Sequence, residues 1–114
     1  MRFRFVWVGK TRDRNWKALQ GEYLKRLSRF VSCEVSETRD PAKGTTPETE
    51  GNQLLELLNP KSFVILLDVN GTSLTSQEMA KRVENWQNRS IKEISFIIGG
   101  SEGVAAREYI PIQK

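Results

Sequence analysis

Histidine is absent from the sequence and only one of its 114 residues is cysteine. Without a second cysteine no disulfide can form within the chain, which excludes a small secreted fold held together by such bonds. Without histidine, the usual zinc sites and acid–base catalysis by an imidazole are excluded. We therefore expect no metal. The single thiol, Cys33, lies at the start of an expected strand and is interpreted as structural.

Long hydrophobic runs are also missing. No stretch approaches the length of about 20 apolar residues that a membrane-spanning helix needs. The apolar residues near the N-terminus are interrupted by Arg4 and end at Gly9, which makes the run too short for the core of a signal peptide. The sequence therefore predicts a cytoplasmic protein with no membrane partner.

The chain has the length of one domain, which we place over residues 1–114. Eighteen Lys and Arg against fourteen Asp and Glu give a net charge of +4 and a pI near 9.5. Such a charge favours polyanions such as nucleic acid, because binding releases their counterions. A solvated basic surface would have the same composition, so charge alone leaves both readings open.

Strands are indicated by apolar or alternating runs at residues 3–8, 32–37, 63–67 and 94–98. The run at 63–67 follows Pro60 and precedes Asn70 and Gly71, which favours a buried central strand over a helix segment. The composition of residues 38–47 is typical of a loop.

Three helices are expected between these strands. Asp13 or Asn15 can cap the first, whose apolar residues recur every three or four positions. This stripe consists of Trp16, Leu19, Tyr23, Leu27 and Phe30. A second helix is expected over residues 48–58. The third begins with Thr75 and Glu78 at the spacing of a capping box and carries Met79, Val83 and Trp86 on one face.

The element order is thus β-α-β-α-β-α-β. Short connections and right-handed crossovers make this a three-layer α/β fold with a parallel sheet. Ligands bind such sheets in the crevice at the carboxyl ends of the strands. Two of these ends stand out, at residues 67–71 and 99–103.

The segment at 99–103 contains Gly99, Gly100 and Gly103 beside Ser101 and Glu102. Glycines leave the backbone uncovered, so that a flat ligand such as adenine can approach main-chain groups. A tight turn from strand to helix would need glycine equally. The pattern is neither a phosphate-binding P-loop nor a dinucleotide-binding G-x-G-x-x-G.

Charged residues at two other strand ends have similarly open interpretations. Asp68 can hold a ligand or take a proton, although Asp before Asn-Gly is more often a turn residue. The basic residues after the first strand can contact RNA phosphates or simply form a solvated helix start. They are Lys10, Arg12, Arg14 and Lys17.

Five motifs in register resemble the ribosomal RNA large subunit methyltransferase H family. They are VWVGK at 6–10, YLKR at 23–26, EG at 50–51, LLDVNG at 66–71 and FIIGGSEG at 96–103. The resemblance covers about residues 1–104. It implies the fold of the SPOUT superfamily, whose members contain a trefoil knot, and it implies a homodimer.

The resemblance further implies methylation of N3 of a pseudouridine in 23S ribosomal RNA, within the assembled ribosome, with S-adenosylmethionine as donor. By the same resemblance Leu67 lines the methyl-donor pocket and Gly99 presents its backbone to the adenosine. Gly100, Ser101, Glu102 and Gly103 belong to the same wall. No catalytic residue is assigned.

Family members continue past the point where this sequence ends, with a further strand, a long helix and a His-rich tail. We therefore expect a SPOUT-like chain that stops before the knot is completed, with cofactor binding that depends on the missing segment. Two alternatives remain, a non-catalytic basic domain that binds RNA or the ribosome, and a marginally folded chain with exposed helix faces.

Overall fold

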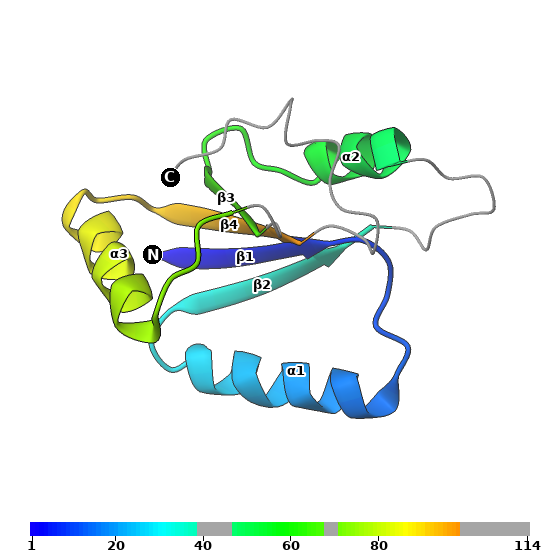
Figure 1. The fold of residues 1–114 in the computed structure, drawn as a ribbon, viewed down its shortest axis with the longest axis horizontal. Helices are drawn as coiled ribbons and strands as arrows, with labels where there is room; N and C mark the ends of the chain where they lie inside the picture. Colours follow the sequence, from blue (N-terminus) through cyan, green and yellow to red (C-terminus); the bar gives the residue numbers. More distant parts are fainter. Residues whose placement is uncertain (39–46, 68–70, 99–114) are drawn as a thin grey trace.

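The computed structural model describes residues 1–38, 47–67 and 71–98. Strands and helices alternate along them as predicted. The elements are β1 (Arg2–Trp7), α1 (Arg14–Leu27), β2 (Ser32–Glu37), α2 (Pro47–Glu56), β3 (Phe63–Leu67), α3 (Ser76–Asn88) and β4 (Glu93–Ile98). Among these residues every strand pairing is parallel, in the order β2-β1-β4-β3. Figure 1 shows α1 and α2 on opposite sides of the sheet, which confirms the three-layer α/β class.

Both helices with described N-termini begin at side chains that accept backbone hydrogen bonds. Asp13 is the cap of α1, since its Oδ1 accepts from the backbone N–H of Asn15 at 2.8 Å and of Trp16 at 3.0 Å. At α3, Thr75 Oγ1 accepts from Glu78 N at 3.1 Å, and Glu78 Oε1 accepts from Thr75 N at 3.2 Å. The predicted capping box is confirmed.

One face of the sheet packs against α2. Its buried side chains are Val6 of β1, Val64 of β3, Ile97 of β4 and Leu54 of α2. Side chains alternate between the two faces of a strand, so Val6 lies here while its neighbour Phe5 lies on the opposite face. The leucines of the second predicted helix therefore cover this face of the sheet, with Leu54 buried and the others packed around it.

The opposite face packs against α3 through aromatic rings. Trp86 of α3 is 4% exposed, and its ring centroid lies 6.3 Å from that of Phe96 and 5.7 Å from that of Phe63. Phe3 meets Phe96 edge to face, with centroids 5.1 Å apart. Edge-to-face and tilted ring pairs of this kind add to the stabilisation from burial alone. The predicted inner face of α3 is confirmed.

Among the described residues, the strand at 63–67 does not have the central position that the sequence predicts. Within the described residues β3 pairs with β4 alone and lies at an edge, while β1 and β4 are the inner strands. The apolar run nevertheless has a physical reason. Val64 and Leu66 face the α2 side, whereas Phe63 and Ile65 face the α3 side. A continuous apolar run indicates that both faces of the strand are covered by other elements. An edge strand can be covered on both faces as well.

The first helix is shorter than its apolar stripe. It ends at Leu27, so Phe30 lies beyond it and is 84% exposed. None of its residues is buried. A cavity of about 380 Å³ lies between α1 and the sheet, lined by Phe5 and Trp7 on one side and by Trp16, Leu19 and Tyr23 on the other. The stripe is therefore real as a pattern, but the described chain does not bury it.

No helix in the described part of the chain has the length and apolar character to cross a membrane.

Candidate active site at the carboxyl edge of the sheet

The last residues of the four strands form one row, because neighbouring strands are parallel and end in register. Trp7 of β1 lies opposite Glu37 of β2 on one side and opposite Ile98 of β4 on the other. Ile98 in turn lies opposite Leu67 of β3. With a strand spacing of about 4.8 Å, the row is about 14 Å long.

The two segments that the sequence singles out follow neighbouring positions in this row. Leu67 precedes one and Ile98 precedes the other, so both segments leave the sheet at the same edge. The side chain of Leu67 is 48% exposed and that of Ile98 is 38% exposed. Of the predicted cofactor residues, only Leu67 is among the described ones. The others, together with Asp68, lie outside the described residues: Gly99, Gly100, Ser101, Glu102 and Gly103.

At the other half of the row a carboxylate joins β1, β2 and the segment that follows β1. The indole Nε1 of Trp7 donates to Glu37 Oε2 at 3.0 Å, and the backbone N–H of Thr11 donates to the same oxygen at 3.2 Å. Thr11 Oγ1 also accepts from Gln20 Nε2 of α1 at 3.0 Å. These bonds hold the β1–α1 connection against both β2 and α1.

A second set of bonds lies just behind this carboxylate. The buried Thr38 donates from its backbone N–H to the carbonyl of Trp7 at 2.9 Å. Its Oγ1 accepts from the backbone N–H of Gly9, also at 2.9 Å. Gly9 has a φ of 75°, a left-handed conformation that glycine adopts without strain. The turn after β1 is therefore held in place by residues at the end of β2.

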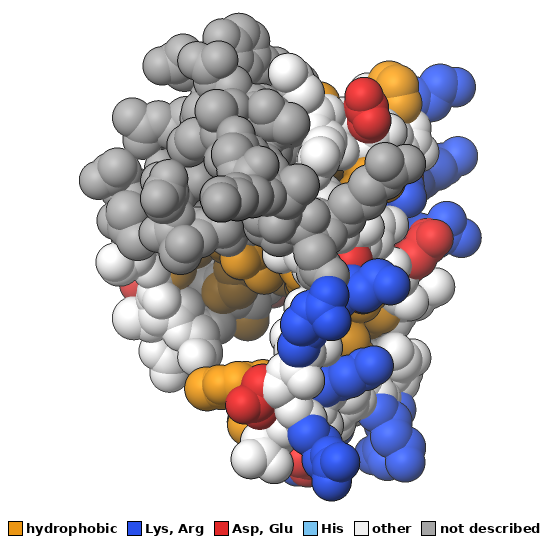
Figure 2. Space-filling view, turned by 90° about the vertical axis from the view of Figure 1, so that its right-hand side faces the viewer, with side chains coloured by type: hydrophobic (Ala, Val, Ile, Leu, Met, Phe, Trp, Pro, Cys, Tyr) orange, Lys and Arg blue, Asp and Glu red, His pale blue; other side chains and the backbone are white. Residues whose placement is uncertain are grey.

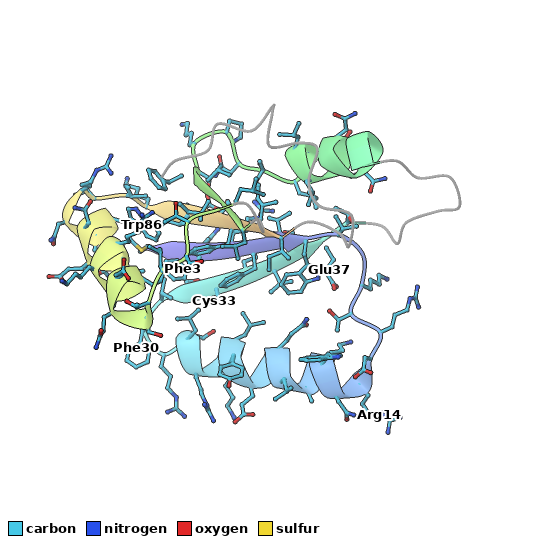
Figure 3. All side chains as sticks on the ribbon, in the orientation of Figure 1. Phe3, Arg14, Phe30, Cys33, Glu37 and Trp86 are labelled. Atoms are coloured by element: carbon cyan, nitrogen blue, oxygen red, sulfur yellow. The ribbon has the colours of Figure 1, made fainter. Side chains whose placement is uncertain are left out.

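The four basic residues named from the sequence all lie on or beside this turn. Lys10 and Arg12 belong to the connection between β1 and α1, and Arg14 and Lys17 belong to the first turn of α1. Figure 2, which looks onto this edge of the sheet, shows Lys and Arg side chains gathered over its lower part, where α1 lies. In Figure 3, Arg14 and Glu37 lie at the same end of the molecule. The structure thus brings these basic residues to the carboxyl edge of the sheet.

Sequence reasoning missed Glu37 and Thr38 as members of this edge. Polar residues in the second strand carry no distinctive signal in the sequence. One signal was available, because the residues that end parallel strands meet at one edge. For that reason, the polar residues at the end of every predicted strand could have been named as candidate site residues.

A three-layer α/β fold whose parallel sheet has apolar and basic groups along its carboxyl edge is typical of proteins that bind ligands at their strand ends. Comparison with known families makes this specific. A sequence model of the family described as "Predicted SPOUT methyltransferase" matches residues 1–110. The chain belongs to the SPOUT methyltransferase family.

Several curated relatives carry the name ribosomal RNA large subunit methyltransferase H. The relative from Streptococcus gordonii is 35% identical, over 94% of this chain and 73% of its own length. The relative from Bifidobacterium animalis subsp. lactis is 34% identical over the same shares, 94% and 73%. The one from Ureaplasma urealyticum is 30% identical over 96% of this chain and 74% of its own length. The resemblance inferred from the five motifs is therefore confirmed.

Proposed function

We propose that this protein transfers a methyl group from S-adenosylmethionine to N3 of a pseudouridine in 23S ribosomal RNA. Membership of the SPOUT methyltransferase family supports the reaction class, and the relatives' printed names support large-subunit ribosomal RNA as substrate. The observation that carries the proposal is the pairing of Leu67 with Ile98 in adjacent parallel strands. It makes both predicted pocket segments begin at one edge.

The described residues fit a nucleoside-shaped cofactor. Leu67 and Ile98 offer two half-exposed apolar side chains about one strand spacing apart, at the tips of the neighbouring strands β3 and β4. Such a surface suits the flat face of an adenosine. We assign the pocket to Leu67 together with Gly99, Gly100, Ser101, Glu102 and Gly103. When bound, the cofactor supplies a methyl group on a sulfonium, which is displaced in line.

The contribution of the protein is to position the reacting groups and exclude water. N3 would accept this methyl group in place of its proton, which would leave to a base. We assign this base to no described residue. The ring nitrogen must lie close to the carboxyl edge, since the pocket segments begin there.

We further propose that the protein acts as a homodimer. The support is the exposed apolar stripe of α1, where Trp16 is 65% exposed and Tyr23 is 64% exposed. Large exposed apolar patches mark interaction surfaces. A second copy would cover this stripe and the adjoining cavity.

The test measures binding and transfer together. Isothermal titration calorimetry of the protein with S-adenosylmethionine should give saturable heat. Methyl-tritiated S-adenosylmethionine with ribosomes that lack this methylation should give label in 23S RNA, located at pseudouridine N3 by mass spectrometry of its nucleosides.

Two matched variants sharpen this test. Leu67→Glu should abolish the binding heat, because a carboxylate would replace an apolar contact in the pocket. Phe30→Glu makes the same kind of change at an exposed position near the opposite end of the sheet (Figure 3) and should bind as wild type. Absence of heat and of label in the wild type would overturn the proposal.

A second candidate function is a basic RNA-binding domain without catalysis, favoured by the net charge of +4. It predicts salt-dependent RNA binding with no heat from S-adenosylmethionine. Label in 23S RNA would eliminate it.

A further inference from the structure

A second cavity opens at the carboxyl ends of β1 and β2. Its volume is about 460 Å³, and it lies between the β1–α1 connection, the first turns of α1 and the end of β2. Trp7 and Glu37 form its inner side. Lys10, Arg12 and Lys17 line the rest together with neutral residues. Three of the four basic residues beside this turn thus converge on one hollow.

The lining of this cavity has an excess of positive charge. Its ionisable members are three cations and one carboxylate. Glu37 also accepts the Trp7 indole N–H and the Thr11 backbone N–H through the same Oε2 atom, so it holds the wall in shape. The cavity is therefore a formed hollow with a net positive lining, suited to an anion larger than a single ion.

Lys17 lies at the end of α1 where the helix dipole disfavours a cation. The positive end of a helix dipole lies at its N-terminus, where acidic residues stabilise a helix and basic residues destabilise it. The first turn of α1 contains no acidic residue but carries Arg14 and Lys17. By contrast, α3 follows the stabilising pattern, with Glu78 in its first turn. Lys17 lines the cavity, so an anion bound there would offset the repulsion between Lys17 and the helix dipole.

We infer that this cavity binds the phosphodiester backbone of RNA beside the nucleotide that is methylated. The inference rests on the proposed function for the identity of the RNA. Trp7 lies directly opposite Ile98, and Leu67 lies one strand further. The cavity wall is therefore about 5 Å from the strand that leads into the glycine segment and about 10 Å from Leu67. Backbone phosphates held here would place a neighbouring base at the methyl-donor pocket.

The test compares two lysines of the same helix. Lys17→Gln removes a charge from the cavity, whereas Lys25→Gln removes one from the last turn of α1, outside it. Binding of wild type and both variants to a fluorescein-labelled fragment of 23S RNA is followed by fluorescence anisotropy across a range of KCl concentrations.

Affinity for single-stranded RNA varies as roughly the −0.7 power of salt concentration for each phosphate contact. Loss of one contact should therefore weaken binding roughly five-fold near 0.1 M KCl and reduce the magnitude of the salt slope by about 0.7. We expect this result for Lys17→Gln and wild-type affinity for Lys25→Gln. Thermal unfolding should show that Lys17→Gln is at least as stable as wild type, because it removes a repulsion with the helix dipole.

The outcomes separate this inference from the proposed function. Equal losses in both variants, or no loss in Lys17→Gln, would overturn the cavity as the RNA site while leaving methyl transfer intact. An RNA affinity that depends on Lys17 in a protein that transfers no methyl group would support the cavity and refute the proposed function. Wild-type protein that fails to bind the RNA at low salt would overturn the inference.

Discussion

The indole N–H of Trp7 donates to the carboxylate of Glu37 over 3.0 Å and so joins the ends of β1 and β2. The same carboxylate oxygen accepts the backbone N–H of Thr11, which fixes the start of the basic connection to α1. One acidic side chain thus shapes a wall that basic residues otherwise dominate. For the RNA binding that we infer at this cavity, the structural and electrostatic effects of Glu37 oppose each other.

Replacing Glu37 by Gln should separate these two effects. The amide oxygen of Gln can still accept from Trp7 or Thr11, so we expect the free energy of unfolding to fall by less than about 1 kcal/mol. The negative charge disappears, however, and RNA affinity should rise roughly two-fold at low salt. Fluorescence anisotropy measures the affinity and urea denaturation the stability. A variant that binds RNA more weakly than wild type would show that the wall's shape outweighs its charge.

The hydroxyl of Thr38 should contribute measurably to stability through the hydrogen bond that it accepts from the backbone N–H of Gly9. Thr38→Val keeps the volume but leaves the backbone N–H of Gly9 without its acceptor in a buried position. An unsatisfied buried donor costs about 1–3 kcal/mol, so urea denaturation should show a loss of that size. Thr38→Ser retains the hydroxyl and serves as the control. Equal losses in both variants would attribute the effect to the methyl group instead.

Much of the fold could be predicted because short sequence patterns indicate the secondary structure of the residues that carry them. The Thr75–Glu78 spacing identifies the start of α3, since both side chains bond to backbone groups within one turn. Alternation of β-type runs with helices likewise predicts a parallel sheet. The order of strands could not be predicted this way. The run at 63–67 is apolar on both faces whether it is an edge or an inner strand, and nothing within it distinguishes the two.

In the candidate site, too, local features could be predicted from the sequence and long-range arrangement could not. The basic residues after β1 were recognised individually, because each is visible in the sequence. Their convergence on one cavity could not be predicted, because that cavity also involves Glu37, which lies 30 positions from its partner Trp7. The apolar stripe of α1 was recognised as well, but periodicity shows only that a face is apolar. It does not show what covers that face, and Tyr23 remains largely exposed.

The aromatic cluster beneath α3 should dominate stability. Trp86 is 4% exposed and contacts rings from two strands, so Trp86→Ala should lower the free energy of unfolding by about 3–5 kcal/mol. That is a large share of the total for a domain of this size. Phe30→Ala removes a ring that is 84% exposed and should change stability by less than about 0.5 kcal/mol. Comparable losses in the two variants in urea denaturation would contradict this account of the core.

Two glycine-to-alanine substitutions should have opposite signs. Gly21 lies inside α1, and an added Cβ there would meet no atom within 4 Å. Gly21→Ala should therefore stabilise the protein by about 0.5–1 kcal/mol, through the higher helix propensity of alanine. Gly9→Ala places a side chain at a φ of 75° and should cost about 1–2 kcal/mol. Thermal unfolding monitored by circular dichroism measures both shifts. A lower melting temperature for Gly21→Ala would contradict this expectation, because it would mean that the added methyl group meets atoms in the cavity that Gly21 lines.

The exposed stripe of α1 should govern self-association if a second copy covers it. Leu19 is 45% exposed in the middle of this stripe and lines the apolar cavity, so Leu19→Glu would place a charge within the proposed interface. We expect wild-type protein to sediment as a dimer in analytical ultracentrifugation and Leu19→Glu to shift towards the monomer, because an unpaired buried carboxylate is strongly unfavourable. Lys25→Glu reverses a charge on an exposed residue of the same helix and should leave the dimer intact. A wild-type protein that stays monomeric across the concentration range, or a Leu19→Glu variant that still dimerises, would refute this assignment of the stripe.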